Sequence, residues 1–200
     1  MKNIDRTIVH MDLDTFFVSV ERLMDSRLQS KPVLVGGTTE RGVVSSCSYE
    51  TRKMGVCSGM SMKMAKQLCP EAIVVRGDSS KYSYYSKIIS EMVKEQVPLF
   101  EKTSIDEFYI DLSGMDHFFG SYKLASEIRS KIIKETSLPI SFGMSINKTV
   151  AKMATSEAKP NNQIDVQKGL EKSFIAPMPI EKIPMVGEKT AYKLNQMGVK

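Results

Sequence analysis

Two amphipathic helical stretches, each next to short apolar strands, constrain the fold of this chain more than any other feature. Apolar and aromatic residues recur at helical spacing over residues 79–97 and again over residues 121–136. Short apolar strands are predicted around them, at residues 7–11, 99–104, 108–112 and 140–145. When the segment between the first strand and the first of these helices is set aside, the order is β–αββαβ. This order predicts a ferredoxin-like α+β fold, with one sheet and two helices on one of its faces.

The segment that interrupts this order has an α/β pattern of its own. Its predicted strands and helix lie at residues 32–35, 42–47, 73–75 and 60–68. Asp14 precedes the apolar helical positions that begin at Phe16, and we predict that it caps that helix. Asn147 is predicted in the same way to cap a helix that ends near residue 158.

Cysteine and histidine are too few to build a soft metal site. The three cysteines form no C-x-x-C pair, and the chain has only two histidines. A bound metal would therefore need oxygen ligands, which favours magnesium. The apolar runs are much shorter than the roughly 20 residues of a membrane span, and no signal peptide is visible at the N-terminus.

Positive charge is concentrated toward the C-terminal end. The 200 residues carry a net charge of +5, and residues 148–200 contain nine lysines and five acidic residues. This distribution favours a phosphate-rich partner, although a solvated lysine-rich face is the alternative.

Three acidic residues lie at the ends of predicted strands. Asp12 follows the first strand, and Asp106 and Glu107 lie in the link between strands 99–104 and 108–112. These strands are neighbours in the β–αββαβ order, so the three carboxylates can meet if the backbone bends between Asp106 and Glu107. Converging carboxylates repel one another unless cations neutralise them, as two magnesium ions do in nucleotidyl transfer. The alternative is that each acidic residue caps or solvates a turn.

Five segments together resemble a known family. They occur in the order seen in bacterial Y-family (translesion) DNA polymerases, and they read HMDLDTFFVSVE, RGVVSSCSYETRKMGV, SIDEFYIDLSG, SFGMSINKTVAKMATSEAKPN and IPMVGEKTAYKL. The resemblance spans nearly the whole chain. It implies an enzyme that adds deoxynucleotides to a primer 3′ end past damaged template bases, with two Mg²⁺ ions in its active site.

The resemblance also implies how the chain is divided. Residues 1–11 and 78–167 would form the palm, 12–77 an inserted small α/β fingers subdomain, and 168–200 the start of a helical thumb. Relatives continue into the rest of the thumb and a little-finger domain that this sequence lacks. We therefore expect a truncated catalytic portion with weak DNA binding and weak activity.

Metal ligands and a steric gate follow from the same resemblance. The implied metal ligands are Asp12, the backbone carbonyl of Leu13, Asp106 and Glu107, and the three carboxylates are the implied catalytic residues. Phe17 corresponds to the steric gate, whose ring would lie against C2′ of the incoming sugar. From spacing alone, Phe16 and Phe17 could both be core residues of one helix.

Further residues of the fingers and palm segments are implied to bind the nucleotide. Ser46, Tyr49, Arg52 and Lys159 would contact the triphosphate, and the Arg52 guanidinium suits phosphate oxygens because its donors form a planar fork. Val43 would cover the nascent base pair.

A helix–hairpin–helix is implied at residues 183–199. It would present backbone N–H groups near Gly187 to a DNA phosphate, with Lys189 and Lys193 adding positive charge. Such hairpins usually carry Gly-x-Gly, and here Met185 replaces the first glycine. A left-handed turn at residue 185 would cost Met some stability. A plain helical hairpin is the alternative.

The implied partners are primed DNA template and deoxynucleoside triphosphates. The full-length protein would also bind a sliding clamp through a C-terminal segment missing here, and we expect a bacterial cytoplasmic protein that binds no membrane. Two alternatives stay open: a nucleotidyl cyclase-like enzyme on the same palm, and a non-catalytic DNA-binding module.

Overall fold

A five-stranded mixed sheet forms the centre of the molecule. The computed structural model describes residues 6–115 and 120–199. In spatial order the strands are β5 (Leu99–Lys102), β6 (Glu107–Asp111), β1 (Ile8–Leu13), β7 (Ile140–Ser145) and β8 (Gln163–Asp165). Strand β1 pairs antiparallel with both β6 and β7, which confirms the predicted ferredoxin-like order. Strand β8, which pairs parallel with β7, was not predicted from the sequence.

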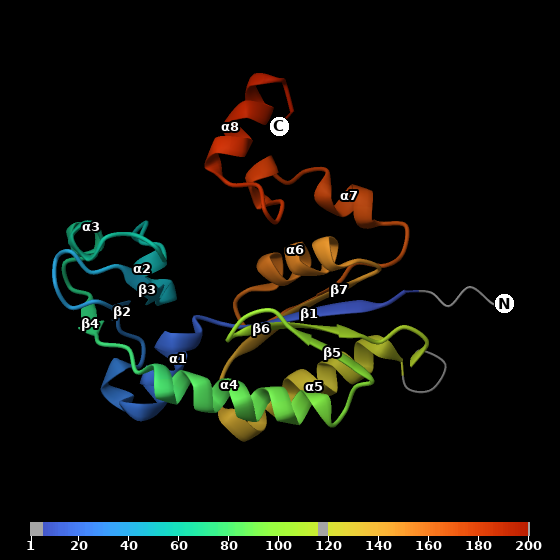
Figure 1. Cartoon of the computed structure of the whole chain (residues 1–200), viewed down its shortest axis with the longest axis horizontal. Helices are drawn as coiled ribbons and strands as arrows, with labels where there is room; N and C mark the ends of the chain where they lie inside the picture. The colour runs from blue at the N-terminus through green and yellow to red at the C-terminus, as the bar shows by residue number, and fades with distance from the viewer. Residues whose placement is uncertain (1–5, 116–119, 200) are drawn as a thin grey trace.

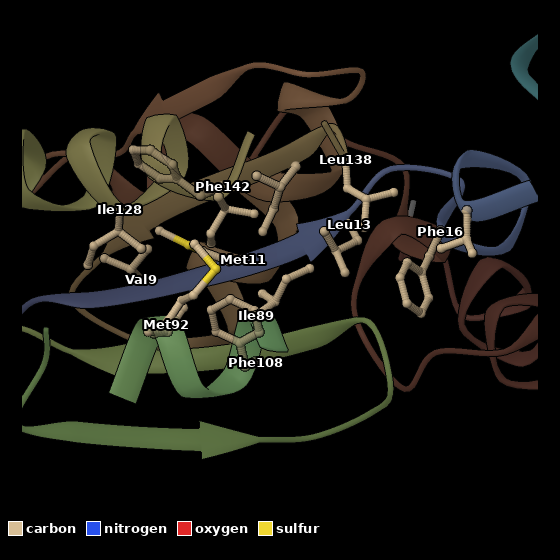
Figure 2. Close-up of a cluster of buried hydrophobic side chains, with 14 of the residues drawn as sticks. Val9, Met11, Leu13, Phe16, Ile89, Met92, Phe108, Ile128, Leu138 and Phe142 are labelled. Carbon is tan, nitrogen blue, oxygen red and sulfur yellow. The ribbon is translucent and has the colours of Figure 1, made fainter. Parts of the chain in front are cut away.

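Two long helices cover one face of this sheet. They are α4 (Ser79–Lys94) and α5 (Ser121–Thr136), and they lie on the same side (Figure 1). Alternate residues of β1, including Val9 and Met11, face them, because successive side chains of a strand point to opposite faces. These side chains pack with Phe108 and Phe142 from the neighbouring strands in a closed apolar core (Figure 2).

The opposite face of the sheet holds α6 (Lys148–Ala158). Asn147 caps this helix as predicted, and its side-chain oxygen accepts from the Val150 N–H at 2.9 Å. The helix packs closely on β7 because Gly143 has no side chain. A Cβ at this position would lie 2.6 Å from the Cβ of Ala154 and closer still to the helix backbone. This contact sets the distance between α6 and the sheet, and therefore how far the side chains of α6 reach over it.

The interrupting segment forms a second, three-stranded sheet with a core of its own. It begins with α1 (Phe16–Met24) and the 3₁₀ helix η1 (Ser26–Leu28). The sheet has the order β3 (Val44–Cys47), β2 (Val33–Gly36) and β4 (Ile73–Val75), and it carries the short helices α2 (Tyr49–Arg52) and α3 (Met62–Leu68). Cys47 and Cys69 are buried in its core as free thiols, as a chain without a disulfide framework requires.

One sequence prediction near this segment is wrong. The N-cap of α1 is Thr15, in a left-handed conformation, and not Asp14. Asp14 is buried, and its carboxylate accepts hydrogen bonds from other parts of the chain, so it has no free oxygen for the helix end.

Short helices follow α6 at the C-terminal end. They are α7 (Glu171–Ile175), the 3₁₀ helix η3 (Ile180–Lys182) and α8 (Glu188–Gln196). The helix–hairpin–helix predicted at residues 183–199 corresponds to η3, the turn that follows it and α8. It therefore begins at Ile180, three residues earlier than predicted. Across the described residues, none of the helices is both long and apolar enough to cross a bilayer.

Candidate active site

Pairing between β1 and β6 brings two of the three predicted carboxylates, Asp12 and Asp106, to one cavity. Asp12 lies within β1, opposite Glu107 in β6, and the Leu13 N–H donates to the Asp106 carbonyl at 3.0 Å. Asp12, Leu13 and Asp106 line one cavity of about 220 Å³. The other predicted site residues on its wall are Phe17, Ser46, Arg52 and Lys159. One cavity therefore joins the end of the large sheet to the small sheet.

A lysine neutralises the charge of Asp12. The Lys159 ammonium lies 2.5 Å from Oδ1 of Asp12, and about a fifth of each side chain is exposed. Burial raises the pKa of Asp12 although Lys159 lowers it, and the nearby Asp106 raises it further. A cation bound at Asp12 would offset the repulsion between Asp12 and Asp106. The oxygen atoms that line the cavity are the ligand type that a hard ion such as magnesium prefers.

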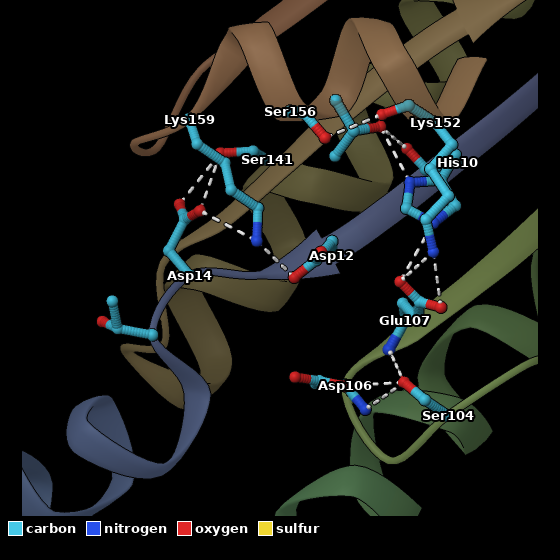
Figure 3. Close-up of polar contacts among 12 residues, drawn as sticks. His10, Asp12, Asp14, Ser104, Asp106, Glu107, Ser141, Lys152, Ser156 and Lys159 are labelled. Atoms are coloured by element: carbon cyan, nitrogen blue, oxygen red, sulfur yellow. Dashed lines mark hydrogen bonds and ion pairs between the residues drawn. The ribbon is translucent and has the colours of Figure 1, made fainter. Parts of the chain in front are cut away.

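Glu107 points away from this cavity. Lys152 of α6 donates to both of its carboxylate oxygens, at 2.9 and 2.8 Å, and Nε2 of His10 lies 3.5 Å from Oε2 (Figure 3). His10 and Lys152 lower the pKa of Glu107 to about 2, against the effect of burial. Among the described residues, no group of three or more acidic, His or Cys side chains is gathered around one metal position. The structure thus brings together Asp12 and Asp106, and it holds Glu107 beside them in a separate ion pair.

Ser104 was missed by the sequence reasoning. Its hydroxyl accepts from the Asp106 and Glu107 N–H groups, at 3.3 and 3.0 Å, and donates to Oδ1 of Asp106 at 2.6 Å. It therefore holds the bend that separates the two acidic side chains. A serine two residues before an acidic pair is the only signal the sequence offers for it.

The two phenylalanines of α1 have different surroundings. Phe16 is buried in the core, whereas Phe17 is partly exposed to the cavity. The Phe17 ring stacks on Tyr82 of α4, with centroids 4.2 Å apart and planes inclined by 11°. Tyr82 donates to Oε1 of Glu21 at 2.6 Å, which fixes the ring on which Phe17 rests. Helical periodicity places Tyr82 on the buried face but does not reveal this stacking partner.

Ser46 and Arg52 lie on the other wall, and Tyr49 contacts Arg52 without lining the cavity itself. Ser46 is 7% exposed, and the Arg52 guanidinium lies 5.4 Å from the centroid of the Tyr49 ring. The Tyr49 hydroxyl donates to Asp14 at 3.3 Å, and burial together with Asp14 raises the pKa of this hydroxyl. Val43 is 52% exposed at the edge of β3 and outside this cavity.

The C-terminal hairpin turns through a left-handed residue at position 185. Met185 adopts a φ of 73° and is 99% exposed. Gly187 has an ordinary φ of −84° and precedes α8, on which Lys189 and Lys193 are exposed. The left-handed position of this turn is thus occupied by a residue other than glycine.

Known families match nearly all of this chain. The pattern described as the impB/mucB/samB family matches residues 11–156, and the one described as the IMS family HHH motif matches residues 171–199. The chain belongs to the impB/mucB/samB family. This assignment agrees with the Y-family motifs and the helix–hairpin–helix found in the sequence.

Relatives of this impB/mucB/samB chain are similar over almost its entire length. A protein named DNA polymerase IV from Dehalococcoides mccartyi is 43% identical over 97% of this chain, and one from Treponema denticola is 39% identical over 98%. The chain spans about half the length of these relatives, 50% in each case. The crystal structure of DinB from Sulfolobus solfataricus is 29% identical to this chain and has a TM-score of 0.90. The match covers 97% of this chain and 58% of the DinB chain. An insertion ternary complex of Dbh DNA polymerase has the same identity, coverage and TM-score.

The Glu107 ion pair should make the stability of this family member depend on pH. Because the pKa of Glu107 falls from 4.5 to about 2 on folding, its contribution is present above pH 4.5 and is lost as the pH falls toward 2. From pH 5.5 to pH 3 this loss is about 2 kcal/mol. Urea denaturation at both pH values should show that the free energy of unfolding of Glu107→Gln changes with pH by about 2 kcal/mol less than that of the wild type. Glu91→Gln on the exposed face of α4 is the control, and equal pH dependence of wild type and Glu107→Gln would contradict the ion pair.

Met185 should be replaceable by glycine with a gain in stability. The left-handed conformation costs a residue with a Cβ roughly 1 kcal/mol, and glycine avoids this cost. Met185→Gly is expected to raise the free energy of unfolding by up to about 1 kcal/mol in denaturant titrations. Met197→Gly, at an exposed methionine with a φ of −87°, should instead lower it. A loss of stability in both variants would argue against strain at Met185.

Proposed function

We propose that this chain is the catalytic portion of a template-directed DNA polymerase of the translesion type. The observation that carries the proposal is the single cavity that joins Asp12 and Asp106 to Phe17, Arg52 and Lys159. Acidic groups, basic groups and an aromatic ring thereby lie within reach of one nucleotide. The names of the relatives, DNA polymerase IV, and of the Dbh ternary complex support the same activity.

In this proposal the large sheet and the small sheet have different tasks. Residues 1–11 and 78–167 are the palm, which holds the carboxylates, and residues 12–77 are the fingers, which close over the nucleotide. Residues 168–200 begin the thumb, whose hairpin at Gly187, with Lys189 and Lys193, would contact the DNA backbone. Primed DNA and deoxynucleoside triphosphates are the proposed partners.

The acidic residues would hold the cofactor. Asp12, Asp106, Glu107 and the Leu13 carbonyl would bind two magnesium ions, which activate the primer hydroxyl and stabilise the pyrophosphate leaving group when bound. For this, Asp12 must release the Lys159 ammonium and Glu107 must release Lys152. Both carboxylates are therefore kept paired with a lysine until a cation of higher charge replaces it.

The basic and hydroxyl groups would bind the triphosphate. Lys159, once released from Asp12, is a positive charge at the cavity wall, and Arg52 adds a planar fork of donors. Ser46 contributes a neutral hydroxyl from the same wall as Arg52. Tyr49 is not among the residues that line the cavity; its hydroxyl donates to Asp14 and its ring supports the Arg52 guanidinium. Val43, exposed at the edge of β3, would lie over the nascent base pair.

Phe17 would select the sugar of the incoming nucleotide. Its ring is held by the stacked Tyr82, so it cannot easily move away from a bulky group. A ribose 2′-hydroxyl placed against this ring would clash, whereas a deoxyribose would fit. Discrimination of this kind comes from excluding the wrong substrate.

Primer extension tests the polymerase activity directly. With Mg²⁺, the four deoxynucleotides and protein in excess over primed template, the wild type should extend the primer, and a chelator should stop it. Asp106→Ala should reduce the rate more than about 100-fold, since even outer partners of metal ligands are worth 10–100-fold. Glu91→Gln should extend like the wild type. D. mccartyi DNA polymerase IV serves as positive control, and extension by that enzyme without any by this chain would contradict the proposal. Turnover of ATP without a template would instead favour a cyclase.

Sugar selectivity tests the role of Phe17. Phe17→Ala removes the ring from the cavity, so the ratio of kcat/KM for deoxynucleotide over ribonucleotide should fall at least about tenfold. Tyr84→Ala, which removes an exposed aromatic ring from α4, is the matched control and should keep the ratio. Unchanged selectivity in Phe17→Ala would show that another group excludes the ribose.

A further inference from the structure

Asp14 is a buried carboxylate beside the cavity, where segments of the large and the small sheet meet. It follows β1, is 1% exposed, and accepts from the Ser141 hydroxyl at 2.9 and 3.1 Å. The Asn161 N–H donates to its Oδ2 at 2.6 Å, and the Tyr49 hydroxyl donates to its Oδ1 at 3.3 Å. A buried carboxylate is stable only when such donors satisfy it. Asp14 is therefore held in one orientation by three separate segments.

The donors to Asp14 come from three segments that are far apart in the sequence. Tyr49 belongs to α2 on the small sheet, Ser141 to β7 of the large sheet, and Asn161 to the loop after α6. A hydrogen bond to a charged acceptor is stronger than one between neutral groups. The bond from Tyr49 thus connects the small sheet directly to the large one at the cavity.

Asp14 also lies next to the lysine that neutralises Asp12. Nζ of Lys159 is 3.9 Å from Oδ1 of Asp14 and 2.5 Å from Oδ1 of Asp12, so it stands between the two carboxylates (Figure 3). A cation on Asp12 would compete with the ammonium there. Asp14 does not line the cavity, and its Oδ1 lies 3.9 Å from Nζ of Lys159. The ammonium would then stay at the wall instead of turning out into solvent.

We propose that Asp14 is a positioning residue that fixes α2 through the Tyr49 hydroxyl and holds the Lys159 ammonium at the cavity, so that Arg52 and Lys159 face the triphosphate. It touches no substrate itself. It acts on both walls at once, so that fingers and palm present their phosphate donors in one geometry. This inference rests on the proposed nucleotide site.

Nucleotide affinity in the presence of Mg²⁺ tests this role. Titration with a fluorescent 3′-O-(N-methylanthraniloyl)-dATP would measure Kd for the wild type, Asp14→Asn, Tyr49→Phe and the double variant. Asp14→Asn preserves shape and removes charge, and it should weaken binding about tenfold. Tyr49→Phe should weaken nucleotide binding several-fold in the wild type and by a smaller factor in Asp14→Asn, because a hydrogen bond from Tyr49 to an amide oxygen is weaker than one to a carboxylate.

A milder variant keeps the test valid if Asp14→Asn fails to fold. Ser141→Ala removes one donor to Asp14 and should weaken nucleotide binding two- to fivefold. Ser90→Ala removes a similarly buried serine hydroxyl from α4 and should leave Kd unchanged. Melting temperatures of all variants would separate lost affinity from lost folding.

The outcomes distinguish this inference from the proposed function. No binding by the folded wild type would overturn the nucleotide site itself, and the inference with it. Wild-type affinity in folded Asp14→Asn, or independent effects of Asp14→Asn and Tyr49→Phe that multiply, would overturn the role of Asp14 alone. If Ser141→Ala is the only variant that folds, an unchanged Kd of that variant would overturn the role of Asp14.

Discussion

The pairing of β1 with β6 is the interaction on which the site depends. It sets Asp12 opposite Glu107 and joins Leu13 to Asp106 through a backbone hydrogen bond. The inward side chains of the same strands fill the core against α4 and α5, so a shift of register by one residue would bury the acidic face. Stability of the core and position of the carboxylates are therefore determined by one set of hydrogen bonds.

Acidic groups gathered at one sheet end require nearby positive charge. Lys159 pairs with Asp12 and Lys152 pairs with Glu107, and both lysines are carried on or just after α6. Gly143 allows this helix to pack close to the sheet, which brings the ammonium groups within reach. Close packing and charge balance are thus linked, because a bulkier residue at Gly143 would move both lysines.

The sequence predicted the bounds of helices and strands correctly where the apolar pattern lies within a single element. The ranges predicted for α5 and β7, 121–136 and 140–145, agree with the structure, because apolar periodicity and buried runs are read directly from neighbours in the chain. The short β8 was missed because three residues give no periodicity and its pairing depends on β7. Comparison with the usual Gly-x-Gly placed Met185 at a glycine position, and its φ of 73° shows that the turn keeps a left-handed backbone there.

The sequence by itself determined the order of strands and helices, the residue types of the site and the family motifs that identify them. Only the tertiary structure decided which of these residues share a cavity, and that Glu107 turns to Lys152 instead. It also decided that Asp14 joins two walls where the sequence indicated a helix cap. The physical reason is that the direction of a buried charged side chain depends on partners distant in the chain. Tyr49, Ser141 and Asn161, the partners of Asp14, all lie far from it in the sequence.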